Sequence, residues 1–319
     1  MRILMIGADA PGLGAADALR ARLRLEFITG QVLPFSAFCP EHTLPLFSAR
    51  QAADALERQV LKGRWDAVVA AHPLPALALT RLQRAGRLAV PVLGLVAGYA
   101  LDPRWARTGC SACALGHGEL LAPAAALGLP PEKLCVTGVP VYRGPGLDRA
   151  EARAALGVPR GGALVLAPDG CREQIDALLH LPDFHPWVAV PCTDDGRRAR
   201  LERHYARQPR VLVRNARFPL ELWLGGCNAL FARPDDLLLA RAATRQVPLV
   251  LLGSTPGAEL FERNGMALCV HEAGAGARAV RLLCQNTARA DAMRRAQQAQ
   301  TYPDAAGSVY RMLLQLVQR

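Results

Sequence analysis

A glycine-containing turn follows the first apolar run of the chain and is the first place where phosphate chemistry could occur. Residues 7–19 read GADAPGLGAADAL, with Gly12 and Gly14 at the start of an expected helix. Free N–H groups and the helix dipole at such a helix start can bind a phosphate group. The spacing is not GxGxxG, so an ordinary tight turn between a strand and a helix is the alternative interpretation.

Two polar residues near other apolar runs could take part in acid–base or binding chemistry. His72 directly follows the run at 67–71, and Glu259 comes shortly after the run at 249–252. A His or a carboxylate in a cleft can deprotonate an acceptor hydroxyl. Each residue also has a structural alternative. His72 could cap a helix or fill the core, and Glu259 could be a favourable carboxylate in the first turn of a helix.

Cysteine spacing offers a different chemistry. Cys110 and Cys113 form a CxxC with His117 nearby, and Cys39 and His42 form a CxxH. Four such ligands could hold zinc. A single CxxC is a weak signal, however, and most of the nine cysteines lie in apolar runs where a free thiol acts as a small hydrophobe. We therefore expect no metal site, no cofactor and no disulfide framework.

The charge balance predicts an anionic partner. The chain of 319 residues carries a formal charge of +11, with local arginine concentrations at 197–217 and 278–295. Such a surface attracts phospholipid headgroups, nucleic acid or a phosphorylated ligand. A dispersed arginine excess can equally be a compositional habit. Nucleic acid is the least favoured partner because aromatics make up only 5% and no nucleic-acid motif is present.

The apolar segments do not predict a membrane span. The longest run, 88–101, contains Pro91 and is shorter than the about 20 residues that a spanning helix needs. The first residues, MRILMIGAD, have too short an apolar core for a signal peptide. We expect a cytoplasmic protein, with peripheral attachment to the inner face of the cell membrane as the variant that the positive charge suggests.

Short apolar runs alternate with amphipathic segments through the whole chain. One set of runs covers 3–6, 67–71, 91–96 and 134–137. A second set covers 163–167, 187–190, 211–213, 229–232, 249–252 and 267–270. Helical patterns lie between them, for example at 15–24, 52–61 and 148–156. This alternation predicts an α/β fold with two doubly wound parallel sheets. The Gly/Pro segment 142–148 separates the two sets and predicts the domain boundary.

The most informative stretch is 65–142, which carries a resemblance to a known family. It reads WDAVVAAHPLPALALTRLQRAGRLAVPVLGLVAGYALDPRW and, after a short gap, ALGLPPEKLCVTGVPVY. It resembles the N-terminal domain of the monogalactosyldiacylglycerol synthases and processive diacylglycerol glucosyltransferases. The segment LFARPDDLLLARAATRQVPLVLLGSTPGAE at 230–259 resembles their nucleotide-sugar loop more weakly. The resemblance implies the GT-B fold, with Rossmann-like domains at 1–143 (acceptor side) and 144–319 (nucleotide-sugar side). The last helix is a candidate to pack back on the first domain.

The resemblance also implies a donor site in the second domain. Its residues stand at the places of the family's nucleotide-binding loops, several with a different side chain. Asp235 and Asp236 replace a glycine pair, and Arg241 replaces the carboxylate that binds ribose. One glycine of a GGG-like loop is kept. The implied donor residues are Gly170, Arg233, Asp235, Asp236, Arg241 and Glu259.

An acceptor or phosphate site in the first domain follows from the same resemblance. Its implied residues are Gly12, Gly14, Gly98, Tyr99 and Trp105, and His72 matches the His of the family's THP segment. Gly98 stands where the family has Asp, and the family's first-loop His has no counterpart before His42. The catalytic residues therefore stay unknown at this stage, with His72 as the weak candidate.

Three functional hypotheses result. The one with the least support is a nucleic-acid or phosphorylated-ligand binder that uses the basic surface. The resemblance implies transfer of a hexose from a UDP-sugar to a lipid acceptor of the diacylglycerol type. The alternative is a catalytically degenerate GT-B protein that binds a ligand or partner. The sequence leaves the sugar, the acceptor, the stereochemical outcome and the oligomeric state open.

Overall fold

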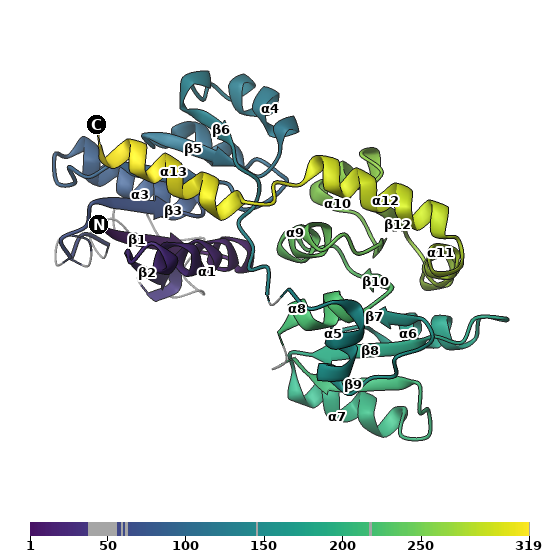
Figure 1. The fold of residues 1–319 in the computed structure, drawn as a ribbon. Helices are drawn as coiled ribbons and strands as arrows, with labels where there is room; N and C mark the ends of the chain where they lie inside the picture. Colours follow the sequence, from purple (N-terminus) through teal and green to yellow (C-terminus); the bar gives the residue numbers. More distant parts are fainter. Residues whose placement is uncertain (38–55, 59, 61–62, 145, 217–218, 319) are drawn as a thin grey trace. The chain divides into compact units, whose positions relative to one another are not determined.

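The computed structural model describes residues 1–37, 56–58, 60, 63–144, 146–216 and 219–318. The chain divides into two compact units. Unit 1 consists of Met1–Tyr142 and Tyr302–Arg319, and unit 2 is Arg143–Thr301 (Figure 1). The boundary lies at the start of the Gly/Pro segment 142–148, and each unit is described here by itself.

The C-terminal helix belongs to unit 1. Helix α13 (Ala305–Val317) contacts α1 (Ala10–Leu25) (Figure 1). Its Val309 and Leu313 are fully buried in the same core cluster as Leu19 of α1. Residues 302–319 therefore lie with the first unit, although their place in the sequence puts them in the C-terminal half.

Unit 1 is built on a six-stranded parallel sheet with the order β2-β1-β3-β4-β5-β6. Its inner strands are short apolar runs buried on both faces, as a parallel sheet covered by helices requires. The edge strand β2 (TGQVLP) is only half-buried and carries polar residues, so it shows no apolar run in the sequence. The strands are β1 (Arg2–Gly7), β2 (Thr29–Pro34), β3 (Ala67–Ala70), β4 (Val92–Leu95), β5 (Ala112–Leu115) and β6 (Leu134–Val136).

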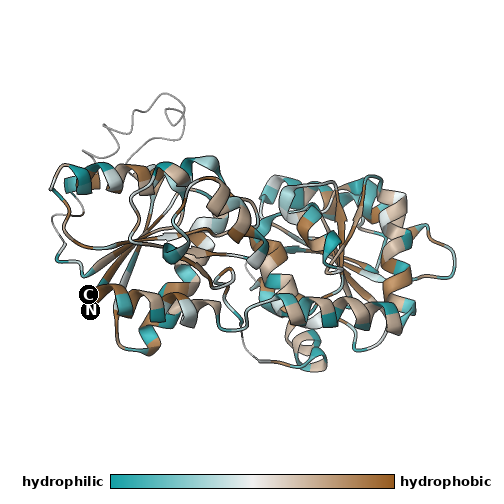
Figure 2. Ribbon diagram, turned by 90° about the horizontal axis from the view of Figure 1, so that it is seen from above, coloured by the Kyte–Doolittle hydropathy of each residue, from teal (hydrophilic) through white to brown (hydrophobic). Residues whose placement is uncertain are grey.

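Unit 2 repeats the plan with the order β12-β11-β10-β7-β8-β9, again all parallel. Its strands are β7 (Leu164–Leu166), β8 (Trp187–Cys192), β9 (Val211–Asn215), β10 (Ala229–Ala232), β11 (Leu249–Leu252) and β12 (Leu268–Val270). In both units the apolar strands lie between layers of helices that turn hydrophilic residues outward (Figure 2).

Helices connect successive strands, and polar side chains fix where several of them begin. Asp9, His72, Asp148, Asp235 and Thr255 each accept a backbone N–H in the first turn of the helix that follows. Such caps satisfy N–H groups that have no partner within the helix. Further helices among the described residues of unit 1 are α3 (Pro73–Arg84), η3 (Pro103–Arg107) and α4 (Leu121–Ala126), with the short η1 (Phe35–Ala37), η4 (Gly118–Leu120) and η5 (Pro131–Lys133). Residues 56–58 and 60 are helical as well, within the predicted helix 52–61. In unit 2 the helices are α5 (Arg149–Leu156), α6 (Arg172–Leu179), α7 (Asp195–His204), α8 (Leu220–Gly226), α9 (Asp236–Thr244), α10 (Pro256–Arg263), α11 (Ala273–Gln285) and α12 (Thr287–Gln300).

Each sheet has one point at which the direction of winding reverses. In unit 1 it lies between β1 and β3, and in unit 2 between β7 and β10. Loops that follow neighbouring strands diverge there and leave a crevice at the carboxyl ends of the strands, which is where open α/β sheets bind ligands. The fold therefore points to one candidate site in each unit. Among the described residues, no helix combines the length and apolar character needed to cross a bilayer.

Candidate functional site

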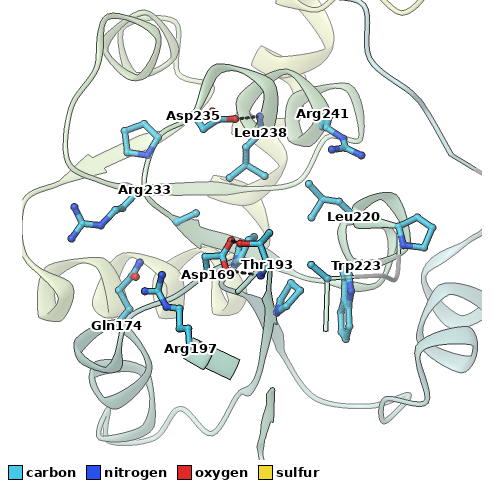
Figure 3. Close-up of a pocket in the computed structure, with 16 residues that line it drawn as sticks. Asp169, Gln174, Thr193, Arg197, Leu220, Trp223, Arg233, Asp235, Leu238 and Arg241 are labelled. Atoms are coloured by element: carbon cyan, nitrogen blue, oxygen red, sulfur yellow. Dashed lines mark hydrogen bonds between the residues drawn. The ribbon is translucent and has the colours of Figure 1, made fainter. Parts of the chain in front are cut away.

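The crevice of unit 2 holds a cavity of about 620 Å³ at the carboxyl ends of β7, β8 and β10 (Figure 3). Its walls come from the loops after these strands and from α6, α7, α8 and α9. A cavity of this size is within the range of small-molecule sites. The lining residues that matter below are Asp169, Gln174, Thr193, Arg197, Trp223, Arg233, Asp235 and Arg241.

Two arginines give the cavity its positive side. Arg233 follows β10 and is exposed, and Arg197 lies in the first turn of α7. Their side chains lie on the same side of the cavity (Figure 3). Both also line an adjoining cavity of about 880 Å³ together with Arg172, Arg200 and His204. Arginines from the concentration around residue 200 in the sequence therefore line the cavities at the switch point of the sheet.

A buried amide lies beside these arginines (Figure 3). Gln174 of α6 is 2% exposed, and its Oε1 accepts the backbone N–H of Cys171 at 3.1 Å. Its Nε2 is buried and has no hydrogen-bond partner among the described residues. A buried donor without a partner costs about 1–3 kcal/mol, so its presence in the wall of a cavity points to a ligand acceptor.

The two aspartates that replace the family's glycine pair are both engaged. Asp235 lines the cavity, and its Oδ1 accepts the N–H of Leu238 at 2.9 Å as the cap of α9. Asp236 is not among the cavity-lining residues; its Oδ1 lies against the backbone of Gly257 in α10. The Asp235 carboxylate thus binds a backbone N–H at the start of α9. A glycine pair at this place would leave the N–H groups available to a phosphate.

The charge of Arg241 is neutralised by a residue that the sequence analysis did not single out. Its guanidinium binds Glu221 of α8, with Nε donating to Oε1 at 2.7 Å and Nη2 donating to the same oxygen. The Glu221 side chain is 2% exposed, and that of Arg241 is 24% exposed. The charge reversal at 241 therefore comes with a carboxylate supplied by a neighbouring helix.

The loops after β7 and β8 are held together at the base of the cavity. Asp169 accepts the backbone N–H and the hydroxyl of Thr193, both at 2.9 Å. Asp169 has a φ of 46°, a left-handed conformation that is uncommon outside glycine. Gly170 lines the adjoining cavity, whereas Glu259 lines neither and accepts the Ser254 hydroxyl at 2.8 Å.

The crevice of unit 1 brings together Asp9 and His72, which are far apart in the sequence. His72 Nε2 lies 3.8 Å from Asp9 Oδ2, and the Asp9 side chain is 49% exposed. Asp9 Oδ1 accepts the N–H of Gly12 at 2.8 Å. A Cβ at Gly12 would lie 2.3 Å from the Ala71 carbonyl oxygen, so glycine is required where α1 passes the end of β3.

The hydrogen bonds of His72 decide which chemistry its ring can do. Nδ1 accepts the N–H of Leu74 at 3.1 Å, so the proton of the neutral ring is on Nε2. A ring in this state donates from Nε2 and has no free lone pair to take a proton. The second oxygen of Asp9 is therefore the better base. The signal for Asp9 was its place two residues after the first strand.

The burial of His72 leads to a prediction about pH. Burial, which outweighs the opposing effect of Asp9, lowers the pKa of His72 below its ordinary value of 6.5. Below about pH 6.5 the unfolded chain therefore binds more protons than the folded chain, and stability is lost as the pH falls toward the folded pKa. We expect the urea midpoint to fall between about pH 7.5 and 5.5, and to fall less in His72→Gln. If the urea midpoint falls equally in the wild type and in His72→Gln, groups other than His72 cause the loss of stability.

The other residues implied for unit 1 are mostly packing residues. Trp105 is 2% exposed and fills the space over Gly94, and Tyr99 is 7% exposed with its ring near His117. The carbonyl of Gly98 lies against Gly116. Gly14 is within α1. The structure brings Gly12 to the Asp9–His72 pair and places the side chains of Tyr99 and Trp105 in the core.

The cysteine cluster shows no metal-site geometry in the described residues. Cys110 and Cys113 are buried, and their thiols interact with each other. His117 Nδ1 accepts the N–H of Glu119. In residues 1–37 and the described ranges beyond them, no group of three His, Cys, Asp or Glu side chains could hold a metal ion. Cys39 and His42 lie outside the described residues.

Two Rossmann-like units with six parallel strands each define the GT-B fold, and solved structures share it. TM-scores are 0.69 to calicheamicin glycosyltransferase CalG4 (14% identity, 100% of this chain, 99% of that chain) and 0.69 to MurG of Acinetobacter baumannii (12%, 98% and 99%). UDP-GlcNAc 2-epimerase of Neisseria meningitidis, solved with UDP-GlcNAc, gives 0.70 (12%, 99% and 100%). Transferases and an epimerase share this fold, so the fold does not by itself decide the reaction.

Within this fold, the sequence is similar to glycolipid synthases. Residues 41–141 match the monogalactosyldiacylglycerol (MGDG) synthase family. The chain is 22% identical over 249 residues to a processive diacylglycerol beta-glucosyltransferase of Staphylococcus saprophyticus, a match that covers 71% of this chain and 61% of the relative. The chain thus spans less than two thirds of the relative's length. The comparisons give no support to the alternative of a catalytically degenerate module.

Proposed function

We propose that the protein transfers a hexose from a UDP-sugar to the hydroxyl of a lipid acceptor of the diacylglycerol type. The observation that carries the proposal is the cavity of unit 2 at the switch point of the sheet. It is lined by Arg197, Arg233 and Gln174, whose Nε2 has no hydrogen-bond partner among the described residues. The matches to MGDG synthase and to the diacylglycerol glucosyltransferase name the reaction class.

The donor diphosphate is assigned to Arg197 and Arg233. A leaving nucleoside diphosphate needs its negative charge stabilised, and guanidinium groups do this by charge-assisted hydrogen bonds. The N–H groups of α9 are less available than in a glycine-rich loop because Asp235 binds one of them. In this proposal, arginine side chains supply most of the stabilisation that backbone groups would otherwise give.

The acceptor hydroxyl is assigned to the Asp9–His72 pair of unit 1. Asp9 Oδ1 is held by the Gly12 N–H. Asp9 Oδ2 takes the proton of the acceptor hydroxyl as the hydroxyl oxygen attacks the anomeric carbon of the donor. His72 positions the oxygen with its Nε2–H. The bond between the anomeric carbon and the donor phosphate oxygen breaks, and the diphosphate leaves with the electron pair.

The donor assignment predicts a loss of nucleotide affinity when an arginine is removed. We expect Arg233→Ala to weaken UDP binding roughly tenfold to a hundredfold, because a charge-assisted hydrogen bond contributes about 1.5–3 kcal/mol. Isothermal titration of the full chain with UDP and UDP-glucose measures it. Arg289→Ala, an exposed arginine of α12, is the matched control. Equal affinity in Arg233→Ala and in the control would remove Arg233 from the donor site.

Transfer itself is tested with UDP-[¹⁴C]glucose or UDP-[¹⁴C]galactose and diacylglycerol in mixed micelles. The expected product is a radiolabelled neutral glycolipid. Binding of UDP without any transfer would overturn the transferase proposal and leave a nucleotide-binding protein. Conversion of a UDP-N-acetylhexosamine to its 2-epimer would point to the other activity found on this fold.

A further inference from the structure

Unit 2 has a second polar cavity at the opposite edge of its sheet. It has a volume of about 520 Å³ and is lined by residues that precede β10 and β11, including Cys227, Val247 and Pro248. The donor cavity opens at the carboxyl ends of the strands, whereas this one lies at their amino ends. It is therefore separate from the site proposed for the nucleotide.

Three arginines from separate segments line this cavity, and none of its lining residues is acidic. Arg143 begins the unit, Arg149 is the first residue of α5, and Arg245 follows α9. Arg143 and Arg149 are exposed. The carboxylates nearest in sequence, Asp148 and Glu151, bind each other's backbone N–H groups in a capping box.

The charge of Arg149 affects the pKa values of two buried groups beneath the cavity, Cys227 and Arg153. Burial raises the pKa of Cys227 to about 12, and Arg149 acts in the opposite direction. The pKa of the buried Arg153 is lowered first by burial and next by Arg149. Arg153 itself is satisfied by neutral oxygens, including the carbonyl of Gly226 at 2.9 Å and Asn228 Oδ1 at 2.7 Å. Within the part of the chain that the structure describes, Arg153 is therefore a buried cation that is bonded to neutral oxygens and to no carboxylate.

Helix dipoles account for only part of this positive charge. Helices α8 and α9 both end at the cavity, with Cys227 and Arg245 as their C-cap residues. Each helix end contributes about half a negative charge. Arg245 lies at one of these ends, and its Nη2 already donates to the carbonyl of Glu221 at 3.3 Å. The two exposed arginines, Arg143 and Arg149, therefore supply the positive charge over the cavity that an anion can neutralise.

We infer that this cavity of unit 2 is a binding site for a phosphate group, held by the exposed Arg143 and Arg149. Guanidinium groups match the geometry of phosphate oxygens by forked hydrogen bonds. The phosphate can belong to a soluble phosphorylated molecule or to a lipid headgroup, since both present the same oxygens. The inference does not depend on the proposed transferase activity.

The test is titration of the full chain with inorganic phosphate, followed by calorimetry or ³¹P NMR. We expect Arg149→Glu to weaken phosphate binding by at least about tenfold, because it replaces an attractive charge with a repulsive one. Arg289→Glu makes the same change of charge away from the cavity and should leave the affinity within about twofold. Arg143→Glu serves as a second cavity variant if Arg149→Glu does not fold.

A donor-site variant separates this cavity from the proposed nucleotide site. Arg233→Glu should keep phosphate binding while weakening UDP binding, and Arg149→Glu should do the reverse. Unchanged phosphate affinity in Arg149→Glu, or a loss found only in Arg233→Glu, would overturn the inference. Sedimentation with phosphatidylglycerol and phosphatidylcholine vesicles then identifies the source. A loss of phosphatidylglycerol binding in Arg149→Glu indicates a lipid headgroup, and unchanged vesicle binding indicates a soluble phosphate.

Discussion

The Asp9→Asn variant is expected to lose sugar transfer by about 10²–10⁴-fold, the usual contribution of a general base. Asn keeps the shape of Asp and can accept the Gly12 N–H through its own Oδ1, so the cap of α1 stays in place. Only the ability of the second oxygen to take a proton is lost. The loss should appear in kcat, while the affinity for UDP, which is assigned to unit 2, should not change.

A second aspartate on the same helix provides the control for Asp9. Asp17 lies on the exposed face of α1 and forms an ion pair with Arg20 at 2.6 Å. Asp17→Asn should retain full activity because this exposed pair contributes at most about 1 kcal/mol. His72→Gln should lower the rate less than Asp9→Asn, since His72 is assigned a positioning role. If His72→Gln removes activity and Asp9→Asn keeps it, the assignment of the base is wrong.

The Arg241→Ala variant is expected to lose about 3–5 kcal/mol of unfolding free energy, because it leaves the carboxylate of Glu221 buried without its partner. Glu221 is 2% exposed, and both hydrogen bonds from Arg241 go to its Oε1. For a unit of this size, the loss corresponds to a fall in Tm on the order of 10 °C. Differential scanning calorimetry of the wild type and the variant measures the shift.

Removing both charges distinguishes the cost of an unpaired charge from lost packing. The double variant Glu221→Leu with Arg241→Leu should be more stable than Arg241→Ala, because buried ion pairs replaced by apolar residues are often neutral in stability. Arg241→Glu should be worse than Arg241→Ala, since it sets a second carboxylate beside Glu221. A loss below about 1 kcal/mol in Arg241→Ala would mean that the pair behaves like an exposed one.

Much of the fold could be predicted because its signals are local. The run at 229–232 corresponds to β10, and the run at 249–252 corresponds to β11. Strands buried on both faces must be apolar along their whole length, so most of them stand out in the sequence. The inner strand β5 (ACAL) was not among the predicted runs, because its small Ala and Cys residues give a weak apolar signal. The edge strand β2 was missed because its half-exposed residues do not need to be apolar. The association of α13 with unit 1 was open because a helix pattern does not specify which sheet it covers.

The candidate sites were only partly predictable. Arg233, Asp235 and Arg241 were predicted together because they stand at the places of the family's nucleotide-binding loop, and all three line one cavity. Gln174 was missed because nothing in its immediate sequence distinguishes it from other helix residues, and Arg197 was noted only as part of the arginine concentration at 197–217. Their significance depends on which strands lie next to each other at the switch point.

The chain alone predicts the two parallel α/β sheets, the boundary near residue 142 and the resemblance to glycolipid synthases, because these depend on periodicity and local motifs. The folded structure sets the partners of the polar side chains. It joins Arg241 to Glu221 across 20 positions and Asp169 to Thr193 across 24, brings Asp9 to His72, and directs Asp236 toward Gly257. Such pairs form between elements that are adjacent in the fold and distant in the chain, so no local pattern encodes them.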